Sequence, residues 1–229
     1  MKKTLVISTG AGISAESGIS TFRDSGGLWE QYPVMEVCSA DGFRRNPALI
    51  HKFYNDRRKG LLAAEPNAAH KGLVKLEDLF DVYVITQNVD DLHERAGQKN
   101  VLHLHGELMK VRALDDETKV FKLGPDQYET SVDTIIDGHH VRPHIVFFQE
   151  AVPNMEPAVD LVRKADIFVV IGTSLNVYPA AGLLHYVPDN AEIFYIDPNP
   201  APVPERVHVI KAPATKGVAI LAEELKKFA

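Results

Sequence analysis

Short runs of β-branched and aromatic residues recur along the chain, separated by segments long enough to form helices. The runs are residues 4–8, 82–86, 144–148, 167–171, 192–196 and 207–211. Residues 167–171, Ile-Phe-Val-Val-Ile, are apolar without interruption, which is typical of a strand buried on both faces of a parallel sheet. The sequence therefore predicts an α/β fold in which helices cover a parallel sheet.

Segments with helical character lie between these strands. They are residues 47–62, 68–80, 157–164 and 216–228, with Asn67 as a possible N-cap. Residues 24–66 and 111–142 do not follow the alternation, and the second range is rich in Asp, Thr, Lys and Gly. We expect one domain over residues 1–229, in which these two inserted ranges form a smaller lobe.

The composition excludes several classes of protein. With 229 residues, 45% of them hydrophobic, the chain can bury a stable core, and a net charge of −6 with scattered basic residues argues against nucleic-acid binding. The single cysteine, Cys38, excludes a disulfide scaffold and a zinc site built from several thiolates. Because no apolar run approaches the ~18 residues of a membrane span, we expect a soluble cytoplasmic protein with no membrane partner.

A glycine-rich turn directly follows the first predicted strand. Glycines let the backbone approach a pyrophosphate closely, and free N–H groups with the dipole of a following helix attract it. Farther on, Phe22 and Arg23 offer a ring to cover a nucleotide and a guanidinium to clamp a phosphate. Taken alone, the glycines could equally form a plain turn, with Phe22 in the core and Arg23 in solvent. The turn residues are Thr9, Gly10, Ala11, Gly12, Ile13 and Ser14, before a possible helix start at 15–18.

Polar residues also follow two strands near the C-terminus. Gly172, Thr173 and Ser174 come after the strand at 167–171, and Asp197 ends the strand at 192–196. Ligands of open α/β sheets bind at the carboxyl ends of strands, where a carboxylate can accept hydrogen bonds from ribose hydroxyls. Asp197 could equally cap the turn that follows it.

A third polar turn, after the strand at 82–86, gathers amides and carboxylates in Gln87, Asn88 and Asp90. Amides suit a carboxamide or a ribose, and an acid accepts from an amide N–H. Downstream, His103 and His105 would share one face of a strand, and an imidazole before a glycine is a reasonable general base near neutral pH. Each histidine alone is more often structural, and metal binding by histidines lacks an acidic ligand pattern of known spacing.

Five motifs stand in a fixed order along this chain. They are GAGIS at 10–14, GISTFR at 18–23, TQNVD at 86–90, HG at 105–106 and GTSLNVYPA at 172–180. Together they resemble the sirtuin family over nearly the whole length. The resemblance implies a Rossmann-like sheet with a smaller lobe, and removal of acyl groups from lysine of proteins or peptides, in which NAD is consumed to give nicotinamide and O-acyl-ADP-ribose.

The resemblance also implies roles for individual residues. His105 would be the general base that deprotonates a ribose hydroxyl, and Asn88 would be the second catalytic residue. Phe148 and Glu150, in the segment 146–150, would contact the peptide. The NAD-binding set would be Gly10, Ala11, Gly12, Ser14, Phe22, Arg23, Gln87, Asn88, Val89, Asp90, Gly172, Thr173, Ser174, Asp197, Asn199 and Ala214.

A narrower inference comes from Tyr54 and Arg57, which lie three residues apart and so share a face of a helix. A hydroxyl beside a guanidinium suits a carboxylate, and this Tyr-x-x-Arg pair resembles the signature of sirtuins that prefer succinyl-, malonyl- or glutaryl-lysine. The alternative is an ordinary amphipathic helix with Tyr54 packed and Arg57 solvated.

The chain departs from the family in four places, one of which is Asp197 in place of the usual Asn, which should still bind ribose. Sirtuins of this type usually carry four zinc-binding cysteines in the small lobe, whereas residues 111–142 contain none, so we expect no zinc there. Gln149 stands where a glycine is usual in the peptide-pairing segment, and Cys38 aligns with a pocket wall that is often Ala. We expect apolar contacts to hold the lobe together, made by Val120, Phe121, Leu123, Ile135 and Ile136.

Two alternative functions use the same NAD site. An NAD glycohydrolase or ADP-ribosyl transferase would not need Tyr54 and Arg57. A non-catalytic NAD-binding module would not need His105 and Asn88.

Overall fold

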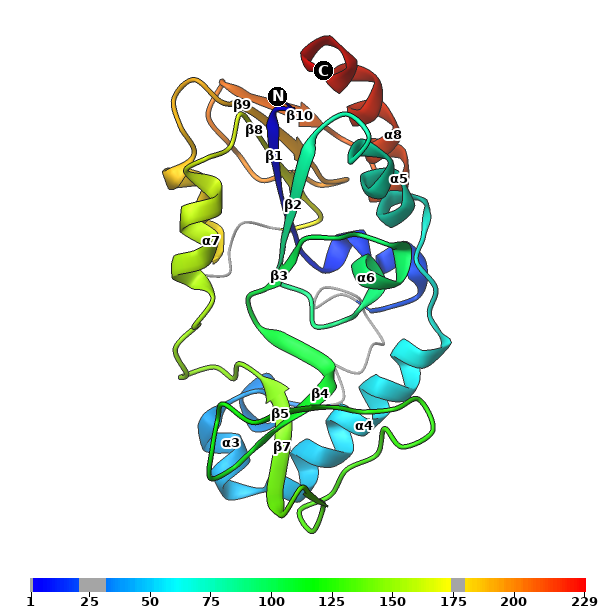
Figure 1. Cartoon of the computed structure of the whole chain (residues 1–229), viewed down its shortest axis with the longest axis vertical. Helices are drawn as coiled ribbons and strands as arrows, with labels where there is room; N and C mark the ends of the chain where they lie inside the picture. Colours follow the sequence, from blue (N-terminus) through cyan, green and yellow to red (C-terminus); the bar gives the residue numbers. More distant parts are fainter. Residues whose placement is uncertain (1, 21–31, 174–179) are drawn as a thin grey trace.

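The computed structural model describes residues 2–20, 32–173 and 180–229. Within them, a sheet has the strand order β10-β9-β8-β1-β2-β3 (Figure 1). Neighbouring strands in it pair in parallel, which confirms the predicted parallel sheet. The strands are β1 Thr4–Thr9, β2 Asp81–Thr86, β3 Val101–His103, β8 Ile167–Ile171, β9 Glu192–Ile196 and β10 Val207–Ile210.

Helices cover both faces of this sheet, as predicted (Figure 1). Alternate residues of β1 supply the two sides: Leu5 and Ile7 are buried in the core with α5 and α8, whereas Val6 is buried in the core with α7 and η3. The fold is therefore a three-layer α/β sandwich. The covering elements are α5 (Ala68–Leu76), α8 (Ala214–Leu225), α7 (Met155–Val162) and the 3-10 helix η3 (Ala180–Tyr186).

The strand order reverses direction beside β1. Strands β2 and β3 follow on one side of it, whereas β8, β9 and β10 follow on the other. In open α/β sheets such a switch point leaves a crevice outside the carboxyl ends of the two central strands, where ligands bind. The predicted glycine turns after β1 and β8 both lie at this point.

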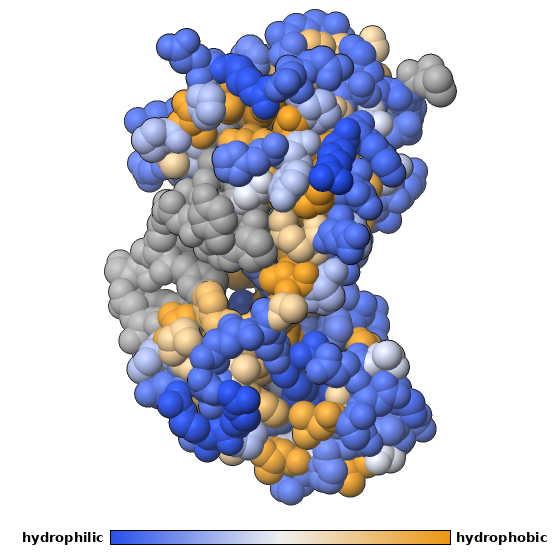
Figure 2. Space-filling model, turned by 90° about the vertical axis from the view of Figure 1, so that its left-hand side faces the viewer, coloured by the Kyte–Doolittle hydropathy of each residue, from blue (hydrophilic) through white to orange (hydrophobic). Residues whose placement is uncertain are grey.

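A small lobe lies below the parallel sheet in Figure 1, and the space-filling view narrows between the two (Figure 2). Its antiparallel sheet has the order β5-β4-β7-β6. Of the strand predicted at 144–148, residues 144 and 145 form the end of β7 and the rest lie outside the named strands, so its placement in the parallel sheet was wrong. The lobe's elements are β4 Gly106–Ala113, β5 Val120–Lys122, β6 Ile135–Ile136, β7 His139–Ile145, α2 Val34–Val37, α3 Ala40–Arg45 and α4 Pro47–Ala63.

Apolar contacts hold this lobe together only in part. Leu123 is buried, and Phe121 and Ile136 pack half-buried against the lobe's core. Val120 and Ile135 are 39% and 58% exposed, so the prediction that they hold the lobe was wrong. Both lie on the short outer strands β5 and β6, which have one partner strand each and leave these side chains in solvent.

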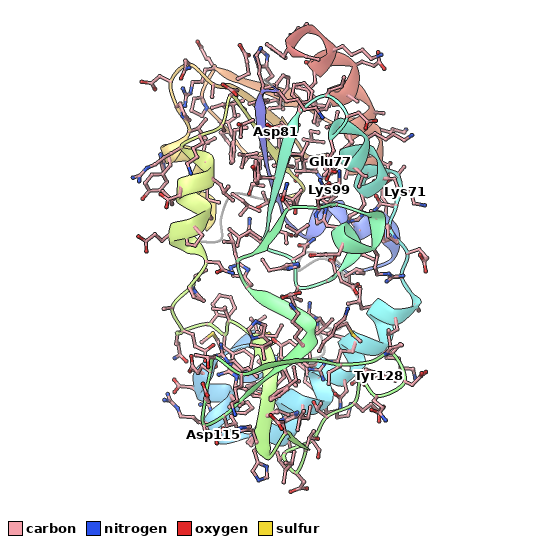
Figure 3. The ribbon with its side chains drawn as sticks, viewed as in Figure 1. Lys71, Glu77, Asp81, Lys99, Asp115 and Tyr128 are labelled. Atoms are coloured by element: carbon pink, nitrogen blue, oxygen red, sulfur yellow. The ribbon has the colours of Figure 1, made fainter. Side chains whose placement is uncertain are left out.

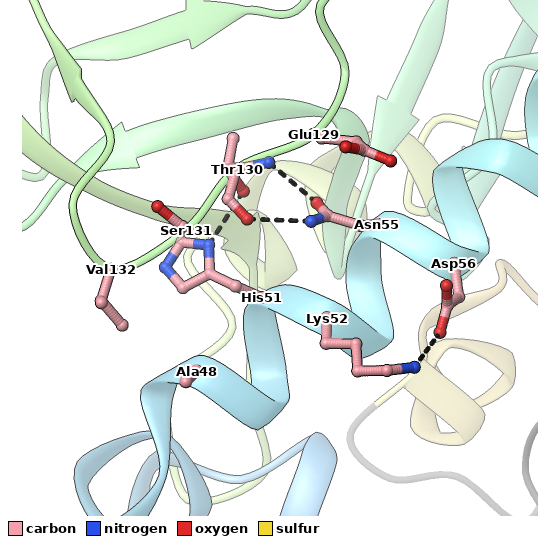
Figure 4. A pocket seen from close by; sticks show the side chains of 9 residues that line it. All are labelled: Ala48, His51, Lys52, Asn55, Asp56, Glu129, Thr130, Ser131 and Val132. Atoms are coloured by element: carbon pink, nitrogen blue, oxygen red, sulfur yellow. Dashed lines mark hydrogen bonds and ion pairs between the residues drawn. The ribbon is translucent and has the colours of Figure 1, made fainter.

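A buried polar network fastens the loop before β6 onto α4. Arg58, 0% exposed, donates from Nε to the Leu108 carbonyl and from Nη1 to Asn55, to the Tyr128 carbonyl and to Thr130. Asn55 and the backbone of Thr130 exchange two further hydrogen bonds (Figure 4). These contacts tie the loop to the helix, and Asn55 and Thr130 also line a polar pocket of about 290 Å³.

Helix α5 ends at Leu76, four residues earlier than predicted. There the carboxylate of Glu77 accepts hydrogen bonds from Gln98 Nε2 and from the backbone N–H of Lys99, and pairs with Lys99 Nζ at 3.2 Å (Figure 3). These bonds join the end of α5 to the turn that leads into β3. In the described residues, each helix is too short or too polar to cross a bilayer.

Candidate functional site

The turn after β1 is built from two single 3-10 turns, η1 (Ala11–Ile13) and η2 (Ala15–Ser17). Gly18 ends them in a left-handed conformation with φ +84°. The possible helix start at 15–18 is therefore a single 3-10 turn that ends at Gly18. Backbone N–H groups of short turns remain the local source of positive potential.

The two glycine turns close directly on each other. Gly12 N–H donates to the Gly172 carbonyl at 2.8 Å, and Gly10 N–H donates to the Ile171 carbonyl at 3.0 Å. A Cβ on Gly12 would lie 2.6 Å from Gly172 Cα, and Gly172 itself has φ +62°. Glycine is therefore required for this backbone contact, which joins the carboxyl ends of β1 and β8 into one floor.

Ser14 and Asn88 link this floor to the turn after β2. Asn88 Nδ2 donates to the Gly10 carbonyl at 3.2 Å and to Ser14 Oγ at 3.1 Å. Ser14 Oγ donates in turn to Asp90 Oδ2 at 2.9 Å. Burial raises the pKa of Asp90, and its hydrogen bonds from Leu92 N–H and Ser14 oppose that rise. Side chains from residues 10–14 and 87–90 thus meet as predicted by their places at strand ends.

Sequence reasoning missed a hydrogen-bonded chain beneath this turn. Thr9 and Thr86 face each other at the ends of β1 and β2, and their hydroxyls lie 2.9 Å apart. Thr86 Oγ1 accepts from Asn88 N–H, and Thr9 Oγ1 lies 3.1 Å from His93 Nε2. Threonine at the last position of two adjacent strands was the available signal.

His105 contacts the backbone of Gln87, the first residue of the turn after β2. Its Nδ1 is 3.1 Å from the Gln87 carbonyl oxygen, which can only accept, so Nδ1 carries the proton. The half-buried setting lowers the pKa of His105, an effect that the Gln87 bond partly offsets. The Nε2 atom therefore keeps its lone pair near neutral pH, as a general base requires.

Gly106 fixes where His105 stands. Its φ is +86°, and a Cβ there would lie 2.0 Å from the His144 carbonyl oxygen. No side chain fits that position, because the neighbouring atom is backbone of the paired strand β7.

At the far end of the floor, Thr173 and Asp197 are buried, with 8% and 6% exposure. Asp197 Oδ1 accepts from Asn199 N–H at 2.8 Å, so the carboxylate does cap the turn that follows β9. Ala214 is the buried first residue of α8, whose start is joined to η2 by Thr215 and Glu16. These residues lie at the carboxyl edge on the β8–β10 side.

Tyr54 and Arg57 lie on α4, on the lobe side. Tyr54 is 1% exposed, and its hydroxyl is 3.4 Å from Cys38 Sγ. The Arg57 guanidinium carbon lies 5.6 Å from the centre of the Tyr54 ring. Burial raises the pKa of the Cys38 thiol, while Tyr54 and the positive charge of Arg57 act against the rise. Hydroxyl, thiol and guanidinium therefore form one cluster.

The segment 147–150 packs beside this cluster through backbone hydrogen bonds. Phe148 N–H donates to the Cys38 carbonyl, and the Phe148 carbonyl accepts from Ala40 N–H. Gln149 adopts φ +77°, a conformation that suits the glycine usual there, and its amide pairs with Asp41 in two hydrogen bonds. The Phe148 side chain is 47% exposed at the surface.

The carboxylate of Glu150 is hydrogen-bonded to residues of the small lobe. Its carboxylate accepts from Arg142 at 2.6 and 3.1 Å, from Phe147 N–H at 2.8 Å and from Arg112 at 3.4 Å. The charge of Glu150 therefore organises the end of β7. Phe22, Arg23 and Ser174, which the sequence assigns to the same site, lie outside the described residues.

Comparison with known proteins places these features in context. The profile of the Sir2 family matches residues 10–179. The chain is 55% identical to an NAD-dependent protein deacylase of Bacteroides thetaiotaomicron, over 99% of this chain and 97% of that protein. It is 48% identical to an NAD-dependent protein deacylase of Helicobacter pylori, over 99% of each. A solved Sir2 homologue in complex with NAD superposes with a TM-score of 0.87 at 36% identity, covering 99% of this chain and 91% of that one.

Proposed function

The chain belongs to the Sir2 family, and we propose that it is an NAD-dependent protein-lysine deacylase that removes succinyl and malonyl as well as acetyl groups. Relatives named NAD-dependent protein deacylase, matched over nearly the full length, support the reaction class. The choice of acidic acyl groups depends on the Tyr54–Arg57 pair.

The described residues fit a dinucleotide at the carboxyl edge. The joined turns at Gly12 and Gly172 offer backbone at the switch point, and buried Asp197 stands at the end of the neighbouring strand β9. We assign the phosphates to the first turn and the ribose and adenine side to Thr173, Asp197 and Asn199. Gln87, Asn88, Val89 and Asp90 would hold the nicotinamide end.

NAD, when bound, supplies a ribose carbon from which nicotinamide departs, leaving that carbon open to the acyl oxygen. His105 accepts a proton at Nε2 from a ribose hydroxyl, because its Nδ1 proton is held by the Gln87 carbonyl. Asn88 is fixed through Gly10 and Ser14, so its side chain is oriented before substrates arrive. Preorganised groups of this kind lower the barrier without reorganisation during the reaction.

The observation that carries the acyl preference is the cluster of Tyr54, Cys38 and Arg57. Phe148, in the proposed peptide-binding segment, bonds to the backbone of Cys38, so the cluster lies beside the proposed entry of the lysine. A guanidinium binds a carboxylate in a charge-assisted pair, and a tyrosine hydroxyl adds a further donor. An acetyl group carries no carboxylate, so it cannot form this charge-assisted pair with Arg57.

The proposal is tested by incubating the protein with NAD, with and without a succinyl-lysine peptide, and measuring nicotinamide and O-succinyl-ADP-ribose by mass spectrometry. We expect nicotinamide only with the peptide, in equal amount to the acyl product. Release without peptide would assign a glycohydrolase or transferase instead, and binding without turnover would assign a non-catalytic NAD-binding module.

A further inference from the structure

Two histidines two residues apart hold consecutive carbonyl groups of the turn after β2. His105 Nδ1 lies 3.1 Å from the Gln87 carbonyl, and His103 Nδ1 lies 3.0 Å from the Asn88 carbonyl. The proposed catalytic Asn88 is thus held through its own main chain by a residue to which the proposed reaction gives no role.

The second nitrogen of His103 is bound as well. Nε2 lies 2.8 Å from Glu94 Oε1, at the start of α6 (Leu92–Ala96). A carbonyl and a carboxylate both accept, so each ring nitrogen of His103 must carry a proton to satisfy both contacts. The geometry therefore requires the imidazolium form, in a side chain that is 7% exposed.

The surrounding charges agree with that form. Burial disfavours the charged ring, yet the bond and charge of Glu94, with the Asn88 carbonyl, raise the pKa of His103. The other titratable groups that face it are Glu107 and Lys110 of β4, Asp90 of the turn and His93 of α6. Lys110 Nζ pairs with Glu107 at 2.5 Å, so Glu94 and Glu107 each have a cationic partner, His103 and Lys110 respectively.

We propose that His103, held by Glu94, is a positioning residue that fixes the Asn88 carbonyl and so keeps the turn 87–90 in the shape that binds the nicotinamide end of NAD. The proposal rests on the function proposed above. His103 acts through the Asn88 backbone and needs no contact with NAD itself. The Asn88 side chain is anchored to Gly10 and Ser14, so the His103 bond supplies the second restraint, on the peptide plane.

Two substitutions separate positioning from bulk stability. In His103→Asn the amide nitrogen takes nearly the place of Nδ1 and can still donate to the Asn88 carbonyl. His103→Phe fills the space but donates nothing. We expect His103→Phe to weaken NAD binding about 10-fold and to lower kcat about 10-fold, with His103→Asn within about 3-fold of wild type, as one lost charge-assisted bond implies.

His51→Phe is the matched control, because His51 is an equally buried histidine of the small lobe, bonded to Thr130. It is expected to lower the Tm and leave NAD affinity unchanged, measured by titration calorimetry on folded protein. Equal NAD affinity in wild type and His103→Phe would overturn the proposal. Calorimetry needs no turnover, so an inactive wild type would count against the deacylase function while leaving this test intact.

The pH profile gives a second readout. The hydrogen bonds of His103 to the Asn88 carbonyl and to Glu94 are both present while the ring is protonated. They weaken as the pH rises through the pKa of His103, because the neutral ring has one N–H for two acceptors. Glu94→Gln removes the charge that raises that pKa, so the alkaline loss of NAD affinity should begin at a lower pH than in wild type. An unmoved alkaline limb contradicts the proposal.

Glu94, His103 and Glu107 also offer three ligand atoms within 4.8 Å of one another, enough to hold a divalent cation. The pairing of Lys110 with Glu107 favours the ion-pair arrangement instead. Loss of NAD affinity with EDTA, restored by Zn²⁺ in wild type but not in Glu107→Gln, would assign the cluster to a metal and overturn the positioning role. Unchanged affinity in EDTA supports it.

Discussion

The His105 imidazole donates its Nδ1 proton to the Gln87 carbonyl oxygen over 3.1 Å. One backbone group of the proposed nicotinamide-binding turn therefore sets the tautomer of the proposed base. This hydrogen bond couples the proposed base to the turn proposed to bind the nicotinamide end.

Removing this imidazole tests its role as base. His105→Ala should lower kcat by about 10²- to 10⁴-fold, the range for loss of a general base, while NAD affinity changes little. Stopped assays of nicotinamide and acyl product would measure it. Retention of more than a tenth of the wild-type rate would show that another group takes the proton.

The pH dependence follows from the lowered pKa of His105. The free base persists below the usual histidine value of about 6.5, so the acid limb of kcat/KM should lie under that pH. Activity falls as the pH drops through the lowered pKa. An acid limb at or above 6.5, measured at saturating peptide, would mean that burial does not control this group.

Arg57→Met tests acyl selectivity. Loss of the guanidinium should reduce kcat/KM for succinyl-lysine about 10- to 100-fold and for acetyl-lysine less than about 3-fold, because only the succinyl carboxylate pairs with it. Lys59→Met removes an equal charge from an exposed position of the same helix and should change neither. Parallel losses on both substrates in Arg57→Met would exclude the carboxylate role.

Arg58, adjacent to Arg57, should instead control stability. Arg58→Met leaves the carbonyls of Leu108 and Tyr128 without their donor, at a cost of about 2–4 kcal/mol in the free energy of unfolding. Urea titration followed by circular dichroism measures the loss. A change below about 1 kcal/mol would mean that the loop 124–134 is held by other contacts.

Two buried histidines make stability depend on pH. Burial lowers the pKa of His51 and of His70 to about 4, whereas in the unfolded chain each titrates near 6.5. Between these values the unfolded state binds more protons, so stability falls as the pH drops from about 6.5 to about 4. The Tm of wild type should decline over this window, and His51→Gln should decline less steeply.

The parallel sheet could be predicted because its central strands are mostly apolar: β8 and β9 have the bounds that the sequence indicates. The strand at 144–148 looked the same, but its first two residues end β7, which pairs antiparallel with β4 and β6 in the small lobe. Apolar pattern alone does not distinguish the two sheets.

The site could be predicted as a set of strand ends, but its internal contacts could not. Thr9 and Thr86 carry only the signal of their place at strand ends, and Glu94 carries none; their partners are side chains that only the fold brings near them. Val120 and Ile135 show that an apolar residue does not always mark the core. Both remain exposed, because they lie on outer strands that no second layer covers.

The central claim is that NAD lies across the carboxyl edge of the parallel sheet with its reactive ribose beside His105. A crystal structure of the protein soaked with ADP-ribose tests this most directly. We expect the pyrophosphate at the joined turns of Gly12 and Gly172, and a ribose hydroxyl within hydrogen-bond reach of His105 Nε2. A ligand bound elsewhere, or a ribose beyond reach of that nitrogen, would contradict the account.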